Sequence, residues 1–73
     1  MVVSANKAPI IFGERIKILR KQKGLSQEEL ALNSGIDRSY LGKIERGESN
    51  IALKKIILIS NALKIPPKTL FGF

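Results

Sequence analysis

Two helix starts separated by a single glycine constrain the fold of this chain more than any other feature. They lie in the run LSQEELALNSGIDRSYLGKIERG, residues 25–47, where Ser26 and Glu29 have the spacing of a capping box. Asp37 is a second N-cap, because its side chain can accept from the free N–H groups of Ser39 or Tyr40. Gly35 lies between the two and can adopt the positive φ of a tight turn. We therefore expect two short helices that cross steeply, the second of which is closed by Gly47.

The apolar spacing elsewhere predicts further helices and no strand. Phe12, Ile16 and Leu19 share one face of a helix that ends at Gly24. Pro67 is expected to begin a last helical turn, Lys68–Phe71. Between these two, the sequence predicts a helix over 52–63, with Asn50 standing in for the capping residue that Ala52 cannot supply. Its inward residues are expected to be Leu53, Ile56, Ile59, Ser60 and Leu63.

These elements make an all-α chain of five helices. Residues 1–9 are small and polar and end in Pro9, which is typical of a flexible arm. Residues 10–73 then form one domain, as the length of 73 residues suggests. A core this small is marginal, so pairing with a second copy would add burial.

Composition excludes several classes of function. The chain has no cysteine and no histidine, so it lacks disulfides, the usual soft metal ligands and the imidazole of most acid–base catalysts. We expect no enzyme, no cofactor and no small-molecule ligand. Neither a signal peptide nor an apolar run of membrane-spanning length is evident, which predicts a cytoplasmic protein.

The net charge of +7 favours a polyanionic partner. Nucleic acid comes first, and an anionic membrane second, because the cations are scattered over several short helices and not along one amphipathic face. The alternative is that these cations serve solubility alone.

In a helix-turn-helix the second helix enters the major groove. On that helix Leu41 and Ile44 face inward, while the residues expected to face outward are Arg38, Ser39, Gly42, Lys43 and Arg46.

The run LSQEELA-x(3)-GID-RSYLGKIERG resembles the helix-turn-helix family of phage repressors and Cro proteins over about residues 13–71. Within that family it is most similar to the controller proteins of restriction–modification systems. The resemblance implies a five-helix, lambda-repressor-like domain with the helix-turn-helix formed by helices 2 and 3. It also implies a transcriptional regulator that binds a palindromic operator in double-stranded DNA as a homodimer, by occupying it or by contacting RNA polymerase. The alternative is an antitoxin or adaptor-type protein-interaction module on the same fold.

The resemblance also assigns roles to single residues. Gln27 would bond a phosphate and brace the reading helix, and Arg20 and Glu45 would form an ion pair between the first and third helices. The implied DNA contacts are Gln27, Arg38, Ser39, Tyr40, Lys43, Arg46, Ser49 and Asn50. Tyr40 has the alternative of lying at the edge of the core. Glu48 departs from the family pattern, since that loop position is often basic, and Gly42 stands where a longer polar side chain is common.

Apolar side chains near the C-terminus predict a surface for self-association. Leu58 is expected to point away from the buried stripe of its helix, and other apolar residues lie close to it in the sequence. Patches of this kind often mark interfaces, and members of the family commonly dimerise through this region. The predicted dimer interface consists of Leu58, Ile65, Leu70, Phe71 and Phe73.

Overall fold

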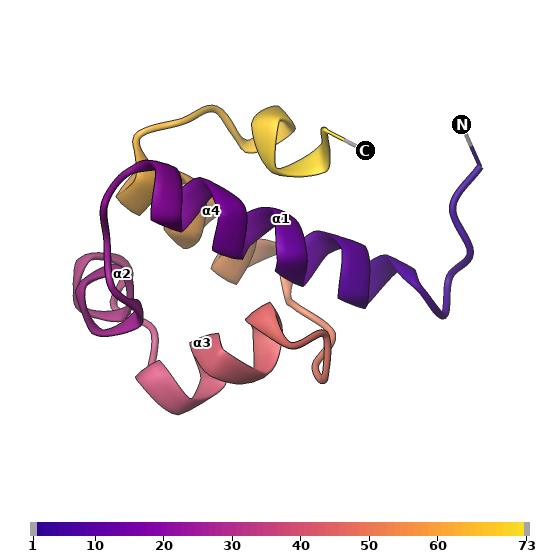
Figure 1. Cartoon of the computed structure of the whole chain (residues 1–73), viewed down its shortest axis with the longest axis horizontal. Coiled ribbons are helices and arrows are strands. Elements are labelled where there is room, and N and C mark those ends of the chain that lie inside the picture. Colours follow the sequence, from indigo (N-terminus) through magenta and orange to yellow (C-terminus); the bar gives the residue numbers. More distant parts are fainter. Residues whose placement is uncertain (1, 73) are drawn as a thin grey trace.

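The computed structural model describes residues 2–72, which form helices joined by loops and contain no strand (Figure 1). The elements are α1 (Ala8–Gln22), α2 (Gln27–Ser34), α3 (Arg38–Glu45), α4 (Leu53–Leu63) and the 3-10 helix η1 (Pro67–Phe71). The all-α prediction is confirmed. The prediction of five helices is right in the number and order of the elements, but the last one is a 3-10 turn.

Helix α1 begins earlier than its apolar spacing predicts. Ala8 and Pro9, expected in the N-terminal arm, lie in its first turn. Proline is well suited to this place, because its φ is already helical and the N–H it lacks would have no partner there. The backbone N–H groups of Lys7 and Ala8 both donate to the carbonyl of Ser4, at 3.0 Å, so the chain turns before it enters the helix.

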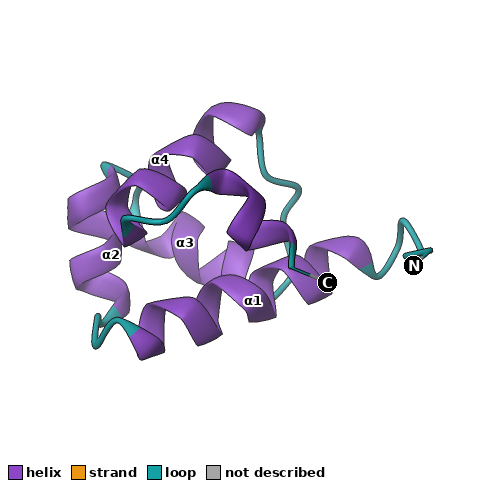
Figure 2. Cartoon of the chain, turned by 90° about the horizontal axis from the view of Figure 1, so that it is seen from above, coloured by secondary structure: helices purple, strands orange, loops and turns teal. Residues whose placement is uncertain are grey.

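Helix α1 packs against α3, α2 packs against both α3 and α4, and η1 lies on α1 and α4 (Figures 1 and 2). Every element contributes apolar side chains to one core, among them the fully buried Ile16, Leu30, Leu41, Ile59 and Leu70. On α4 the predicted inward residues Ile56, Ile59, Ser60 and Leu63 are buried. Leu53 is the exception: it is 73% exposed, because it begins the helix before the part that other elements cover.

The 3-10 helix η1 folds back across the helices and completes the core. Arg15 on α1 donates its Nε–H to the carbonyl of Thr69 at 3.1 Å, and the ring centroids of Phe71 and Phe12 lie 5.1 Å apart. Leu70 is consequently 0% exposed, so its prediction as an interface residue is wrong. The sequence shows that Leu70 is apolar, but it does not show that η1 brings this side chain into the core.

Gly13 permits the close approach of α1 to α3. A Cβ placed on Gly13 would overlap the carbonyl oxygen of Ile44 and lie 2.9 Å from that of Glu45. Any larger side chain would push the two helices apart. The position of α3 relative to the rest of the domain therefore depends on this glycine.

Candidate nucleic-acid interface

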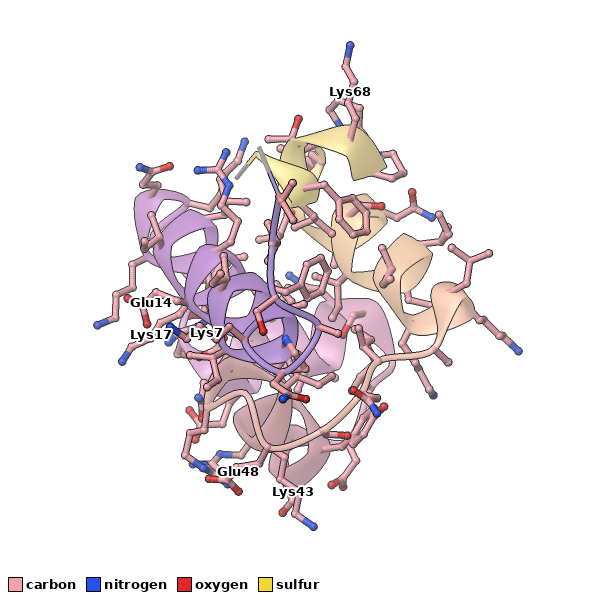
Figure 3. The ribbon with its side chains drawn as sticks, turned by 90° about the vertical axis from the view of Figure 1, so that its right-hand side faces the viewer. Lys7, Glu14, Lys17, Lys43, Glu48 and Lys68 are labelled. Carbon is pink, nitrogen blue, oxygen red and sulfur yellow. The ribbon has the colours of Figure 1, made fainter. Side chains whose placement is uncertain are left out.

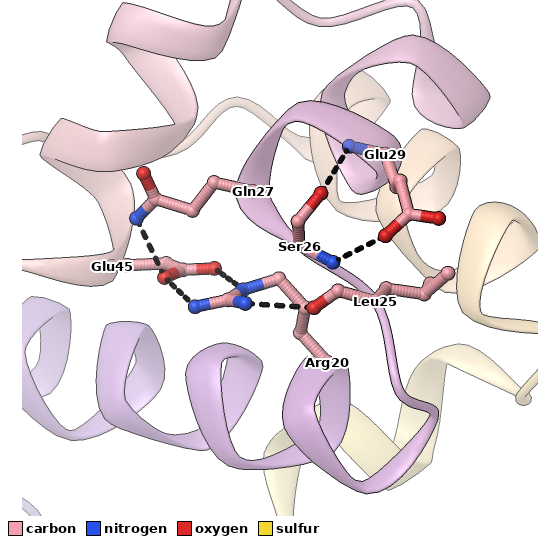
Figure 4. A network of polar contacts seen from close by, with 6 residues as sticks. All are labelled: Arg20, Leu25, Ser26, Gln27, Glu29 and Glu45. Carbon is pink, nitrogen blue, oxygen red and sulfur yellow. Dashed lines mark hydrogen bonds and ion pairs between the residues drawn. The ribbon is translucent and has the colours of Figure 1, made fainter.

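The α2–turn–α3 segment has the local structure that its sequence predicts. The Ser26 hydroxyl accepts from the N–H of Glu29 at 3.1 Å, and the Glu29 carboxylate accepts from the N–H of Ser26 at 2.9 Å (Figure 4). This reciprocal pair lowers the pKa of the Glu29 carboxyl. Gly35 ends α2 with φ of 73°, and Asp37 caps α3 by accepting from the N–H of Tyr40 at 3.3 Å. Two independent caps thus fix the turn between the helices.

A buried polar network holds the three N-terminal helices together (Figure 4). Arg20 donates to both carboxylate oxygens of Glu45, at 2.8 and 3.1 Å, which confirms the predicted ion pair. Arg20 also donates to the carbonyl of Leu25 at 2.8 Å, and Gln27 donates to Glu45 at 2.9 Å. Every buried side-chain polar atom in the described part of the chain has a hydrogen-bond partner. The network joins α1, the start of α2 and the end of α3, and so sets the direction in which α3 points.

The outer face of α3 is polar and basic. Arg38, Ser39, Lys43 and Arg46 are exposed, while Leu41 and Ile44 are buried as predicted. In Figure 3, Lys43 and Glu48 project together from the end of the molecule opposite Lys68. Tyr40 is half-buried at the edge of the core, and its hydroxyl donates to the carbonyl of Asn50 at 3.4 Å. The exposed side chains can reach a partner without any change in the core.

Two of these cations are held by carboxylates of the same chain. Arg38 donates its Nε–H to Glu28 on α2 at 3.2 Å. Arg46 donates to both oxygens of Glu48, at 2.7 and 3.4 Å. The hydrogen bond to Glu48 and the charge of that group raise the pKa of Arg46, and the same hydrogen bond lowers the pKa of the Glu48 carboxyl. The sequence did not predict either pair, since neither has a recognisable motif.

Other predictions for this face need correction. Gly42 was expected to face outward but is buried, because the guanidinium of Arg46 covers it: a Cβ on Gly42 would lie 3.1 Å from Arg46 Nη1. Asn50 does not cap α4, whose N-cap Ala52 has no side-chain hydrogen bond. Ser49 and Asn50 lie in the loop after α3, where the Ser49 hydroxyl donates to the Asn50 carbonyl at 3.2 Å.

The predicted dimer residues do not form one exposed patch. Leu58 and Ile65 are half-buried and pack against the core, Phe71 is 49% exposed, and Phe73 lies outside the described residues. The structure instead exposes Leu53 and Ile57, which sequence analysis had not assigned to an interface. These two lie one turn apart on α4, a spacing that could have identified them.

Residues 2–72 offer neither a cluster of metal ligands nor a membrane-spanning helix. No group of three or more acidic side chains there is arranged to hold a metal ion. None of the helices in that range has the length and apolarity needed to cross a bilayer.

Comparison with known proteins identifies relatives of this chain in sequence and in structure. A family profile described as Helix-turn-helix matches residues 16–70. The chain is 39% identical over 69 residues to the control protein C.BamHI of Bacillus amyloliquefaciens, covering 93% of this chain and 85% of the relative. It is 42% identical over 68 residues to the control protein C.MunI of a Mycoplasma species, with 92% of each chain covered. The crystal structure of the restriction-modification controller protein C.AhdI from Aeromonas hydrophila is similar with a TM-score of 0.86 and 50% identity, over 88% of this chain and 97% of that chain.

Proposed function

The chain belongs to the helix-turn-helix family of DNA-binding transcriptional regulators, and on this premise we propose that it reads a specific operator as a homodimer and serves as the controller of a restriction–modification system. The family consists of DNA-binding regulators and not of enzymes. The controller role is supported by the similarity to C.BamHI, C.MunI and C.AhdI across most of the chain. A cytoplasmic location follows from this proposal, because operator DNA lies there.

The observation that carries the proposal is the exposed, basic outer face of α3, a helix that the buried Arg20–Glu45 pair ties to α1. Arg38 is the first candidate to read a guanine, because a guanidinium can donate two hydrogen bonds to its O6 and N7 atoms. Its bond to Glu28 uses Nε and leaves the two terminal nitrogens of Arg38 free for such a contact. Ser39 and Lys43 are the further base-reading candidates on the same exposed face.

The remaining contacts would be made to the phosphate backbone, which supplies much of the affinity and fixes the register of the reading helix. Gln27 lies at the start of α2, and its amide carries two N–H donors. The hydrogen bond to Glu45 uses one of these N–H groups, so the other can donate to a phosphate. Arg46, Ser49 and Asn50 would meet the backbone at the other end of α3, with Tyr40 packing against a sugar.

We propose that two copies pair through α4 and η1. The 73-residue chain has a small core, and Leu53, Ile57 and Phe71 leave apolar surface exposed on these two elements. An isologous interface would bury that surface on both copies at once. Leu58 and Ile65, which are half-buried against the core, would lie between this interface and the core. The pairing should set the two α3 helices about 34 Å apart, one turn of DNA, and the dimer would act by occupying its operator or by contacting RNA polymerase.

The proposal is tested by selecting bound sequences from a random duplex library with the unmutated protein. A palindromic consensus with half-sites one helical turn apart is expected. A double variant, Arg38→Ala with Lys43→Ala, provides the control, because it should retain the fold and lose the consensus. Failure to enrich any sequence, or a consensus without two-fold symmetry, would contradict operator reading by a homodimer.

A further inference from the structure

The Arg46–Glu48 ion pair occupies the edge of the guanidinium that would otherwise bind a phosphate. Nε and Nη2 of Arg46 donate to the two oxygens of Glu48, at 2.7 and 3.4 Å. This forked arrangement is the one by which arginine binds carboxylate and phosphate alike. A DNA phosphate and the Glu48 carboxylate therefore compete for the same donors.

The backbone fixes Glu48 beside Arg46. At the end of α3 the N–H of Glu48 donates to the carbonyl of Lys43 at 2.9 Å, and the N–H of Gly47 donates to that of Ile44 at 3.0 Å. These two bonds form a Schellman motif, which needs the left-handed conformation that Gly47 adopts at φ of 74°. A Cβ on Gly47 would lie 2.6 Å from Cα of Ile10, so α1 also requires glycine here. The helix ending thus places Glu48 within reach of Arg46, and its carboxylate accepts from that guanidinium.

The absence of a side chain at Gly42 leaves room for the guanidinium of Arg46. The guanidinium lies across α3 at Gly42, where a Cβ would be 3.1 Å from Nη1 of Arg46. The charge of Lys43 also lowers the pKa of the Glu48 carboxyl. One carboxylate therefore offsets part of the field of two cations at the end of the reading helix.

The pair is accessible enough to open. The side chains of Arg46 and Glu48 are 57% and 54% exposed. Exposed ion pairs of this kind contribute little to stability in water, so a phosphate can replace the carboxylate. The buried Arg20–Glu45 pair, at 9% and 2% exposure, cannot be reached in this way.

We propose that Glu48 is an internal competitor of DNA phosphate for Arg46, which lowers the affinity for DNA in general and reduces its dependence on salt. Arg46 must release the Glu48 carboxylate when it binds a DNA phosphate. Its phosphate contact therefore adds less to the affinity for DNA than a contact from an unpaired cation would. This inference rests on the proposed function, since it concerns the same interface. It gives a role to the acidic residue that departs from the family pattern.

The test is the salt dependence of binding to random-sequence duplex DNA by the full chain and its Glu48→Gln variant. Removing the carboxylate frees Arg46, so affinity should rise roughly two- to fivefold, the equivalent of one exposed ion pair. The slope of log K against log salt concentration should become steeper by about 0.9, as for one added phosphate contact. Circular dichroism should show an unchanged fold, because the pair is exposed.

Two controls separate this mechanism from a general effect of charge. In an Arg46→Gln background, Glu48→Gln should change affinity and slope much less than in the unmutated protein, because only the effect of its charge on Lys43 remains. Glu14→Gln alters net charge equally at an exposed position on α1, away from Lys43 and Glu48 in Figure 3, and should leave the slope unchanged. Equal gains with and without Arg46 would overturn the proposal, as would an equal gain for Glu14→Gln or no gain for Glu48→Gln. In each case a unique operator could still be selected, so the proposed function would stand; a protein that bound no duplex would overturn both.

Discussion

Arg20 and Glu45 lie 25 residues apart in the sequence and form a two-pronged ion pair with almost no exposure to solvent, at 2.8 and 3.1 Å. The pair joins the last turn of α1 to the last residue of α3. Its position explains how a helix of eight residues keeps a fixed direction.

Replacing Glu45 with Gln should lower the free energy of unfolding by about 3–5 kcal/mol, because Arg20 would remain as a buried charge without its counter-ion. Urea denaturation followed by circular dichroism measures the loss. The matched control is Glu28→Gln, which breaks the exposed pair with Arg38 and should change stability by less than about 1 kcal/mol. Similar losses for the two variants would contradict the structural role assigned to burial.

The same substitution, glycine to alanine, should have opposite effects at two positions. Gly13→Ala forces α1 away from the backbone of α3 and should destabilise the fold by roughly 1–3 kcal/mol. The Cβ of Gly42→Ala would meet the end of the flexible Arg46 side chain at 3.1 Å and the Gln27 Oε1 at an ordinary contact distance of 3.8 Å, so its better helix propensity should stabilise the fold by up to about 1 kcal/mol. Thermal unfolding of both variants is the measurement. A stable Gly13→Ala variant would show that the two helices can separate without loss.

Arg38→Ala should weaken binding to the selected operator by about 1–3 kcal/mol and relax the preference at one base pair in each half-site. Competition binding with single-base operator variants measures this loss. Lys17→Ala removes a half-buried cation on α1 and should change all sites nearly alike, if it changes any. Should Arg38→Ala lose the same affinity on operator and on random DNA, Arg38 would be a phosphate contact and not a reader of bases.

Ile57→Glu should disrupt the proposed dimer, because a charge placed in that interface would lose water without gaining a partner. Ile57 is 39% exposed, and Ile18 on α1 is 41% exposed, so Ile18→Glu is a control of equal burial on a different helix. Sedimentation equilibrium at micromolar concentration should show a dimer for the unmutated protein and for Ile18→Glu, and a monomer for Ile57→Glu. A monomeric unmutated protein, free and on DNA, would contradict the dimer itself.

Local patterns predicted local structure well. The capping box at Ser26, the N-cap at Asp37 and the left-handed turn at Gly35 each depend on a few neighbouring residues, and all three are present. The Arg20–Glu45 pair is not local, and its prediction came from the family resemblance, supported by the position of both residues beside apolar stripes.

The burial of a residue was predicted wrongly where it depends on which other element covers that residue. Leu53 lies on the same side of α4 as the buried stripe but is 73% exposed at the start of the helix, and Leu70 is covered because η1 folds back. Gly42 is buried by the reach of Arg46. Gly13 has a role that no periodicity indicates, because its close approach to the backbone of α3 is set by how the two helices pack. These features are set by the packing of the whole domain.

The two faces of α3 differ in what a substitution would disturb. Leu41, Ile44 and Glu45 are buried and tied to other helices, whereas Arg38, Ser39 and Lys43 point into solvent and no core side chain depends on them. Under the proposed function, a lineage can therefore exchange the exposed residues one at a time, at little thermodynamic penalty, and arrive at a different operator on an unchanged scaffold. Divergence of DNA preference among relatives of this chain should accordingly be fast on that face, while the buried face drifts slowly.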